Sequence, residues 1–192
     1  FTLNTISSTI DKPTGLHVSD LDQDGDKDIV VASYDGDKIS YFDNNGSQSF
    51  TERTVASGSS NVNGPMYVDV ADVDGDGQLD IISASWDDDK VNWYENTTAA
   101  PGTPTFTAAD ISTSANGADG VFAIDLDSDG DIDVLSASYI DDKIAWYEND
   151  GAANPSFTAA TIATSADNAK HVTAADMDND GDIDVISASS GD

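Results

Sequence analysis

The stretch Asp20-Leu21-Asp22-Gln23-Asp24-Gly25-Asp26-Lys27-Asp28 carries aspartate at its positions 1, 3, 5 and 9 and glycine at position 6. The same pattern returns three more times, at residues 72–80, 125–133 and 176–184. Alternate side chains of a tightly curled loop can point at one centre, so the carboxylates of each copy are expected to converge. Glycine at position 6 supplies the backbone conformation that the sharp turn needs.

The convergence of carboxylates in each loop indicates a site for a hard cation, and calcium is the usual ion with six to eight oxygen ligands. Magnesium fits less well because it demands strict octahedral geometry, and zinc prefers histidine or cysteine. The chain has no cysteine, and its two histidines lie outside the loops. Position 7 is expected to bind through its backbone carbonyl, as in the EF-hand. We therefore expect about four calcium ions, one per repeat, held at Asp20, Asp22, Asp24, Asp26, Asp28, Asp72, Asp74, Asp76, Gln78, Asp80, Asp125, Asp127, Asp129, Asp131, Asp133, Asp176, Asp178, Asp180, Asp182 and Asp184.

A single stretch of this kind could also be a polar turn rich in aspartate and glycine. Four copies that keep the same residues at five positions argue against a simple polar turn. Two carboxylates about 4 Å apart repel by about 4 kcal/mol at an effective dielectric constant of ~20. A bound cation would remove that cost.

Charge limits the classes of partner. The 192 residues include 37 acidic and 7 basic side chains, for a formal net charge of −30. Four calcium ions would cancel only about 8 of these charges. Nucleic acids and anionic membranes bind basic patches, so we expect neither as a partner, and no apolar run is long enough to insert into a membrane.

An extracellular location is expected, either secreted or at the cell surface. Open calcium loops need roughly 0.1–1 mM ion to fill, which is an extracellular level. The absence of cysteine fits a secreted protein that is stabilised by metal. Because the chain starts at Phe1 without methionine or a signal peptide, we expect a processed product or a piece of something longer.

The loops begin at residues 20, 72, 125 and 176, and a period of about 52 residues is typical of propellers and other repeat folds. Each repeat contains short β-branched or aromatic pieces bounded by Gly, Asp and Asn, which indicates strands, and no helical period persists. The predicted first strands are Leu16–Ser19, Val68–Ala71, Val121–Ile124 and Val172–Ala175; the second are Ile29–Ala32, Ile81–Ala84, Val134–Ala137 and Val185–Ala188; the third are Lys38–Phe42, Lys90–Tyr94 and Lys143–Tyr147; the fourth are Phe50–Val55, Phe106–Ile111 and Phe157–Ile162.

Four antiparallel strands per repeat predict the blades of a β-propeller. We therefore predict an all-β fold, a single β-propeller domain over residues 1–192 with four blades. Trp93, Tyr94, Trp146 and Tyr147 are expected to fill the spaces between blades, the alternative being a platform on which a ligand stacks.

The two ends of the chain predict how the last blade closes. Phe1–Ile6 matches a fourth strand such as Phe157–Ile162, and Ser189–Asp192 lies in the hairpin after a second strand. If the termini meet, they build a final blade that lacks only its third strand, and a neighbouring chain could add to its exposed edge. The other explanation is a segment cut from a longer propeller.

The aspartate loop followed by Ile29-Val30-Val31-Ala32-Ser33 resembles the FG-GAP/VCBS repeats of bacterial surface proteins and integrin-like propellers. Residues 138–151 are similar to repeats of long secreted proteins of marine bacteria. The resemblance covers essentially the whole chain and implies an extracellular calcium-binding β-propeller used for adhesion or assembly. It implies ligands at positions 1, 3, 5 and 9 of each loop. Propellers of the family often have seven blades, and the family does not fix a ligand.

Three function classes follow. The first is a non-catalytic calcium-binding propeller that adheres or self-assembles as a surface or filament subunit, with calcium in a structural role. The alternative is a module of a larger secreted protein that binds a glycan or a protein, through loops such as Ser57–Gly64, Thr97–Thr105 and Ser112–Gly120. An enzyme is the least favoured class, because His17 and His171 fall at different registers and the serines have no recognisable partner base. The expected partners are thus the chain itself or a glycan or protein ligand.

Overall fold

The computed structural model describes residues 3–58 and 61–191, which form fourteen antiparallel strands in four sheets and no helix. The first sheet holds β1 (Pro13–Ser19), β2 (Asp28–Ser33), β3 (Lys38–Asn44) and β4 (Phe50–Ser57). The second holds β5 (Pro65–Ala71), β6 (Asp80–Ser85), β7 (Lys90–Asn96) and β8 (Phe106–Ser112). The third holds β9 (Ala118–Ile124), β10 (Asp133–Ser138), β11 (Lys143–Asn149) and β12 (Phe157–Ala163), and the fourth holds β13 (Ala169–Ala175) and β14 (Asp184–Ser189). None of the described residues forms a helix long and apolar enough to cross a membrane.

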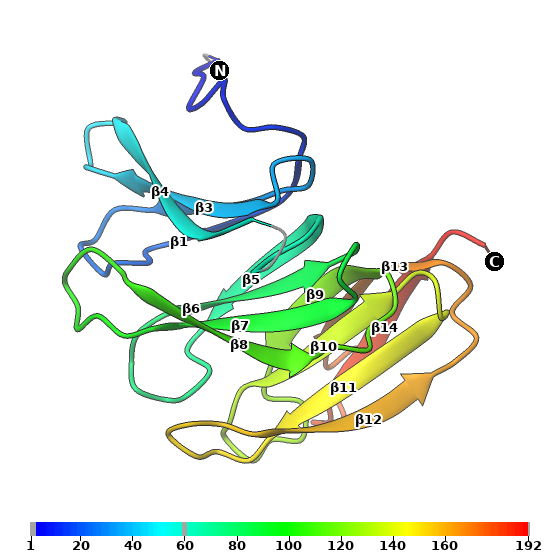
Figure 1. Cartoon of the computed structure of the whole chain (residues 1–192). Coiled ribbons are helices and arrows are strands. Elements are labelled where there is room, and N and C mark those ends of the chain that lie inside the picture. The colour runs from blue at the N-terminus through cyan, green and yellow to red at the C-terminus, as the bar shows by residue number, and fades with distance from the viewer. Residues whose placement is uncertain (1–2, 59–60, 192) are drawn as a thin grey trace.

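Each sheet is a meander in which strands adjacent in sequence are adjacent in space. The sheets stand side by side like the blades of a propeller, with the first strands innermost: β1 packs on β5, β5 on β9 and β9 on β13 (Figure 1). Glycine makes two of these contacts close. A Cβ at Gly15 would meet the Met66 carbonyl oxygen at 2.8 Å, and one at Gly120 would meet that of Lys170 at 2.7 Å. Within the described residues the sheets form an open arc and do not close into a ring.

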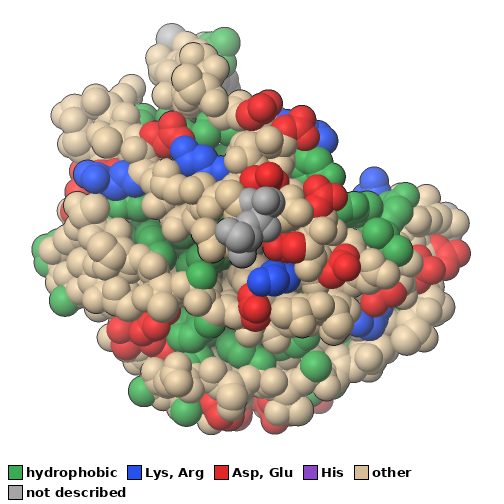
Figure 2. Space-filling view, in the orientation of Figure 1, with side chains coloured by type: hydrophobic (Ala, Val, Ile, Leu, Met, Phe, Trp, Pro, Cys, Tyr) green, Lys and Arg blue, Asp and Glu red, His purple; other side chains and the backbone are tan. Residues whose placement is uncertain are grey.

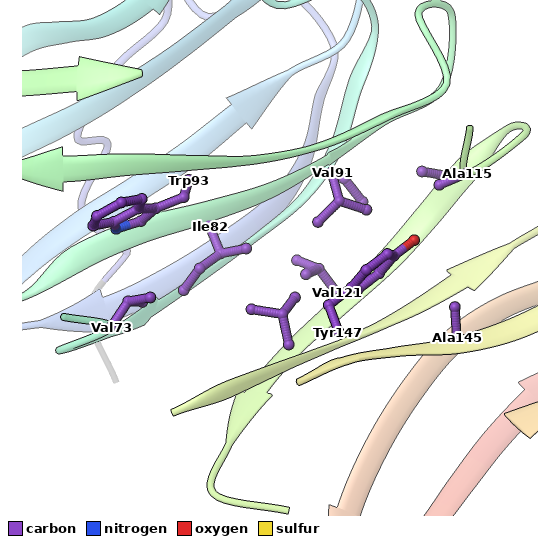
Figure 3. Close-up of a cluster of buried hydrophobic side chains, with 11 residues drawn as sticks. Val73, Ile82, Val91, Trp93, Ala115, Val121, Ala145 and Tyr147 are labelled. Carbon is purple, nitrogen blue, oxygen red and sulfur yellow. The ribbon is translucent and has the colours of Figure 1, made fainter. Parts of the chain in front are cut away.

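The hydrophobic core lies between neighbouring sheets. The cluster between the second and third sheets includes Val73, Ile82, Trp93, Val121 and Tyr147 (Figure 3). Similar clusters fill the spaces on either side of it. The prediction that the paired aromatic residues fill the spaces between blades is confirmed, because Trp93, Tyr94 and Tyr147 are at most 3 % exposed and Trp146 packs against the cluster of the last two sheets.

The predicted closure of the last blade is wrong. Residues 3–12 form no strand, and residues 1 and 2 of the expected strand Phe1–Ile6 lie outside the described part of the chain. Thr5 and Ile6 instead line a hollow of ≈ 340 Å³ together with Leu16, Val31 and other residues of the first sheet. In the complete sheets the fourth strand pairs with the third. The last blade has no third strand among the described residues, so a fourth strand would lack its usual partner. That blade therefore has two strands here, not three.

Candidate metal centre

The four aspartate loops join the first strand of each sheet to the second. The glycine at position 6 has positive φ in every loop, for example 100° at Gly25. The residue at position 4 also has positive φ in every loop, at Gln23, Gly75, Ser128 and Asn179. The sequence pattern does not predict this, because the residue type at position 4 varies. Two left-handed residues in each loop curl the backbone tightly enough to bring distant carboxylates together.

Backbone N–H groups of each loop orient its carboxylates. In the first loop the Gly25 N–H donates to Asp20 Oδ2 (3.1 Å), the Asp24 N–H donates to Asp22 Oδ1 (3.2 Å), and the Asp26 N–H donates to Asp24 Oδ1 (2.9 Å). The same three bonds recur in the other loops. The orientation of the carboxylates is therefore built into the loop.

One carboxylate oxygen at position 1 remains without a partner. Asp20 Oδ1, Asp72 Oδ1 and Asp125 Oδ1 are buried and accept no hydrogen bond within the described residues. A buried unpaired carboxylate oxygen is costly, and a cation is the partner that removes the cost for a negatively charged atom. The donor set thus fits a hard cation at the centre of the loop.

The structure brings three aspartates together in each loop, with ligand oxygens within 4.8 Å of one another. Positions 1, 3 and 9 meet in the first, second and fourth loops, and positions 1, 3 and 5 meet in the third. The groups are Asp20, Asp22 and Asp28; Asp72, Asp74 and Asp80; Asp125, Asp127 and Asp129; and Asp176, Asp178 and Asp184. These repeated clusters can hold metal ions. Outside the groups lie Asp24, Asp76 and Asp180 at position 5 and Asp133 at position 9.

At position 7, the carboxylates of Asp26, Asp131 and Asp182 lie outside every group. The Gln78 side chain instead accepts a hydrogen bond from the Ala100 N–H (3.0 Å), in the connection between the third and fourth strands. A side chain turned away from the centre is compatible with a ligand role for the backbone carbonyl.

Position 9 has a structural role that the sequence pattern does not reveal. Asp80 accepts the Val73 N–H with Oδ2 (3.1 Å) and the Asn96 N–H with Oδ1 (2.7 Å). Asp28 and Asp133 make the same pair of bonds in the first and third sheets. This aspartate therefore joins the loop to the end of the third strand of its own blade.

Burial opposes ionisation of these aspartates. It raises the pKa of Asp80 to about 7 and also raises the pKa of Asp28 and Asp133, while the backbone N–H groups act in the opposite direction. Burial raises the pKa of Asp22 and Asp74 as well. A bound cation would favour the ionised form of every one of these groups.

The fourth loop differs from the other three in burial. Asp178 and Asp184 are exposed, whereas Asp28, Asp80 and Asp133 are 1 % exposed. Asp184 accepts the Met177 N–H (3.0 Å) but has no third strand beside it among the described residues. We therefore expect the fourth site to hold a cation least tightly.

The histidines form no repeated site, as expected. His17 lies opposite Val30, whereas His171 lies opposite Ala188, so the two residues are two steps apart in register. His17 Nδ1 lies 2.8 Å from Asp69 Oδ1, and Asp69 Oδ2 accepts the Ala123 N–H (2.9 Å). His171 packs edge-on against Tyr67. Both imidazoles thus contribute to packing between inner strands.

A solved structure of a lectin from Agrocybe aegerita, described as specifically recognising non-reducing terminal N-acetylglucosamine, is similar to this chain. Its TM-score is 0.60 at 18% sequence identity, and the match covers 92% of this chain but 47% of the lectin. This likeness shows the fold. The chain spans about half the length of that lectin. No curated protein sequence matches the chain.

The model of the FG-GAP-like repeat matches at residues 20–83, 72–136 and 125–187. Each match begins at position 1 of an aspartate loop and ends within the second strand of the following blade. Since these matches cover most of the sequence, and since loop and sheet recur in the structure with the same period, the chain belongs to the FG-GAP-like repeat family.

Proposed function

We propose that the chain is a calcium-stabilised, non-catalytic binding module that acts outside the cell in adhesion or self-assembly. The observation that carries the proposal is the buried, unpaired Oδ1 of Asp20, Asp72 and Asp125 at the same place in three loops. Carboxylate oxygens at this spacing suit calcium better than magnesium or zinc. Figure 2 shows acidic side chains spread over the visible face with few basic ones, which fits a role in a medium rich in calcium and salt.

Calcium would contribute much of the stability of the fold. At a free ion concentration ~100-fold above the dissociation constant, each independent site adds about 2.7 kcal/mol. Four such sites add roughly 11 kcal/mol, which is comparable with the whole unfolding free energy of about 5–15 kcal/mol of a typical domain. Removal of calcium should therefore unfold or greatly loosen the chain.

Calorimetric melting in millimolar calcium and in EGTA tests this role. We expect the melting temperature to fall by tens of degrees in EGTA, or the transition to vanish. The variant Asp72→Asn should lower the melting temperature in calcium, whereas Glu148→Gln, which removes one exposed acid on β11, should leave it unchanged. Equal melting in calcium and EGTA would overturn the structural role of calcium.

Self-assembly is supported by the edge of β14, which no strand covers among the described residues and which is largely exposed along its length. An unprotected edge is a template for another chain. Sedimentation velocity should then show large species in calcium that disappear in EGTA. A compact monomer at high concentration in calcium would contradict self-assembly and leave adhesion to a glycan or protein ligand.

Binding of a glycan or a protein is the second candidate function. The similar fold of a lectin that recognises a terminal sugar supports it. Two of the loops expected to bind connect the fourth strand of one sheet to the first strand of the next. They are residues 112–120 and residues 57–64, of which 59 and 60 lie outside the described part of the chain. The described residues of both loops lie at the end of the sheets opposite to the aspartate clusters. That end of the arc is free of the proposed metal sites.

A further inference from the structure

The inner edge of all four sheets carries the same irregularity. The pairing of β1 with β2 skips Thr14, because Pro13 lies opposite Ser33 and Gly15 opposite Ala32. The first strands of the other sheets skip one residue at the same place, and the skipped residues are Met66, Asp119 and Lys170. A bulge leaves one residue out of the ladder and redirects its side chain, and bulges are frequent beside binding sites.

These four skipped residues line a single hollow. It has a volume of ≈ 360 Å³ and lies where the inner strands of all four sheets begin, at the end opposite to the aspartate clusters. The distance between the two ends follows from the length of the second strands: six residues at about 3.3 Å each separate them by roughly 20 Å. The hollow is therefore separate from the proposed metal sites, and its volume falls within the range of about 300–1,000 Å³ of small-molecule pockets.

The chemistry of the skipped residues varies although their backbone position does not. A second set of bulges, between the third and fourth strands, skips Val55, Ile111 and Ile162, all of them apolar. Val55 and Ile111 pack against the core clusters between sheets, which explains their common apolar character. The inner bulges carry Thr, Met, Asp and Lys instead. Packing does not require that variety, whereas a site that must contact different parts of one ligand does.

Aromatic side chains complete the hollow. Tyr34, Trp86 and Tyr139 each follow the last residue of a second strand and take part in its lining. The rings of Trp86 and Tyr139 lie 5.0 Å apart, tilted by 48°. Lys12 Nζ lies 3.9 Å from the centroid of the Tyr34 ring, and Lys170 Nζ lies 5.6 Å from that of Tyr139. Sequence reasoning considered the buried aromatic pairs as a platform and missed these three residues, although Ala-Ser followed by an aromatic residue recurs in three repeats.

The charges of the hollow are mixed. Two of the seven basic residues of the chain, Lys12 and Lys170, lie here. Lys12 pairs with Asp35 at 3.4 Å. Burial raises the pKa of Asp119, and the positive charge of Lys170 opposes that rise. The hollow therefore offers ammonium donors and carboxylate acceptors next to aromatic rings, without an excess of positive charge.

We propose that this hollow binds one residue of a neutral saccharide, through stacking on Trp86 and hydrogen bonds to Asp119 and Lys170. The proposal rests on the proposed function of a binding module and names the class of its ligand. A sugar ring presents an apolar C–H face, which suits an aromatic ring, and hydroxyl groups that both donate to a carboxylate and accept from an ammonium group. An anionic ligand would meet Asp119 and the field of a chain with a net charge of −30, which disfavours its approach.

The test uses the calcium-loaded chain and a panel of methyl glycosides of N-acetylglucosamine, glucose, galactose and mannose. Saturation-transfer NMR detects binding, and tryptophan fluorescence titration gives the dissociation constant. We expect at least one neutral glycoside to bind, with affinity roughly tenfold or more weaker in Trp86→Ala and in Lys170→Ala. Trp86→Phe should retain most of the affinity because it keeps an aromatic face. Lys27→Ala, which makes the same charge change at the opposite end of the sheets, should bind as the unaltered chain does.

Three results would overturn the proposal: binding of no neutral glycoside, binding only of uronic acids or sulfated sugars, or binding that Trp86→Ala leaves unchanged. The melting temperature of each variant in calcium shows whether it is folded. If Trp86→Ala does not fold, Lys170→Ala decides, and unchanged binding in that variant would overturn the proposal. None of these results decides the role of calcium, which the comparison of melting in calcium and EGTA decides separately. Sugar binding that survives Trp86→Ala would keep the binding module and reject this hollow as its site.

Discussion

The aspartate at position 9 shows how one side chain can have two roles. Both oxygens of Asp80 accept backbone N–H groups, and the same residue belongs to a carboxylate cluster. Each oxygen has a second lone pair, so accepting a hydrogen bond does not prevent it from binding a cation. The loop pattern alone marks this residue as a ligand, because hydrogen bonds to the distant residue Asn96 depend on the folded blade. The sequence therefore predicts the residue but not its structural role.

The two roles can be separated with a pair of variants. Asp80→Asn places an amide N–H₂ against one of the two backbone N–H groups, and a buried donor left unpaired costs roughly 1–3 kcal/mol. We expect this loss of unfolding free energy in EGTA as well as in calcium. The measurement is urea denaturation at pH 8, above the pKa of about 7 that burial gives Asp80.

Asp76→Asn is the matched control. Asp76 is exposed, and its Oδ1 accepts the Gln78 N–H (2.7 Å), which an asparagine carbonyl can also accept. In EGTA this variant should stay within about 0.5 kcal/mol of the unaltered chain. Equal effects of the two variants in EGTA would show that position 9 has no role apart from the cation.

At the scale of strands and sheets, most of the fold is predictable from the sequence. The second strands begin and end within one residue of the predicted runs, because a short apolar run with Asp shortly before and after it has few alternatives. The first strands begin three residues earlier than predicted, at Pro13, Pro65, Ala118 and Ala169. Those extra residues include the inner bulges. A bulge depends on the register between two strands, which local composition does not determine.

The wrong prediction for Phe1–Ile6 has a related cause. Residues 1–6 resemble a fourth strand in amino-acid composition. A strand forms, however, only where the edge of a neighbouring strand is free to pair with it. In the last blade that edge would belong to a third strand, which the described residues do not contain. Ile6 and Ile10 instead line a hollow beside the first sheet, together with Leu16, which is still 63% exposed.

The last sheet should be the least stable element. β6 and β10 are buried along their whole length, whereas β14 is largely exposed and has one neighbour in place of two. Local opening requires least free energy where few apolar contacts are lost. We expect the amides of β14 to exchange with deuterium at least tenfold faster than those of β6 and β10 in calcium. NMR-detected exchange measures this, and equal protection of all three strands would contradict the expected difference.

For the molecule as a whole, charge is the dominant property. With 37 acidic and 7 basic residues, the metal-free chain carries strong self-repulsion that opposes a compact state. Salt shortens the range of that repulsion, from about 10 Å at 0.1 M to about 3 Å at 1 M.

Salt should therefore stabilise the metal-free form. In EGTA, the melting temperature should rise by several degrees between 0.1 M and 1 M potassium chloride. The rise should be smaller in calcium, because bound ions already neutralise the closest carboxylates. Thermal melting followed by circular dichroism is the measurement, and a melting temperature that does not change with salt in EGTA would contradict this account.

The simple order of the strands has a consequence for how the chain folds. Every complete sheet consists of four strands that follow one another in sequence, so each blade closes through short loops. Short-range pairing of this kind is associated with fast folding, and repeats that contact only their neighbours can form one after another. The aspartate at position 9 accepts a hydrogen bond from the last residue of the third strand of its own blade. The metal site of a blade is therefore complete only when the second and third strands have paired. During synthesis from the N-terminus, each folded blade could bind its ion before the next blade is synthesised.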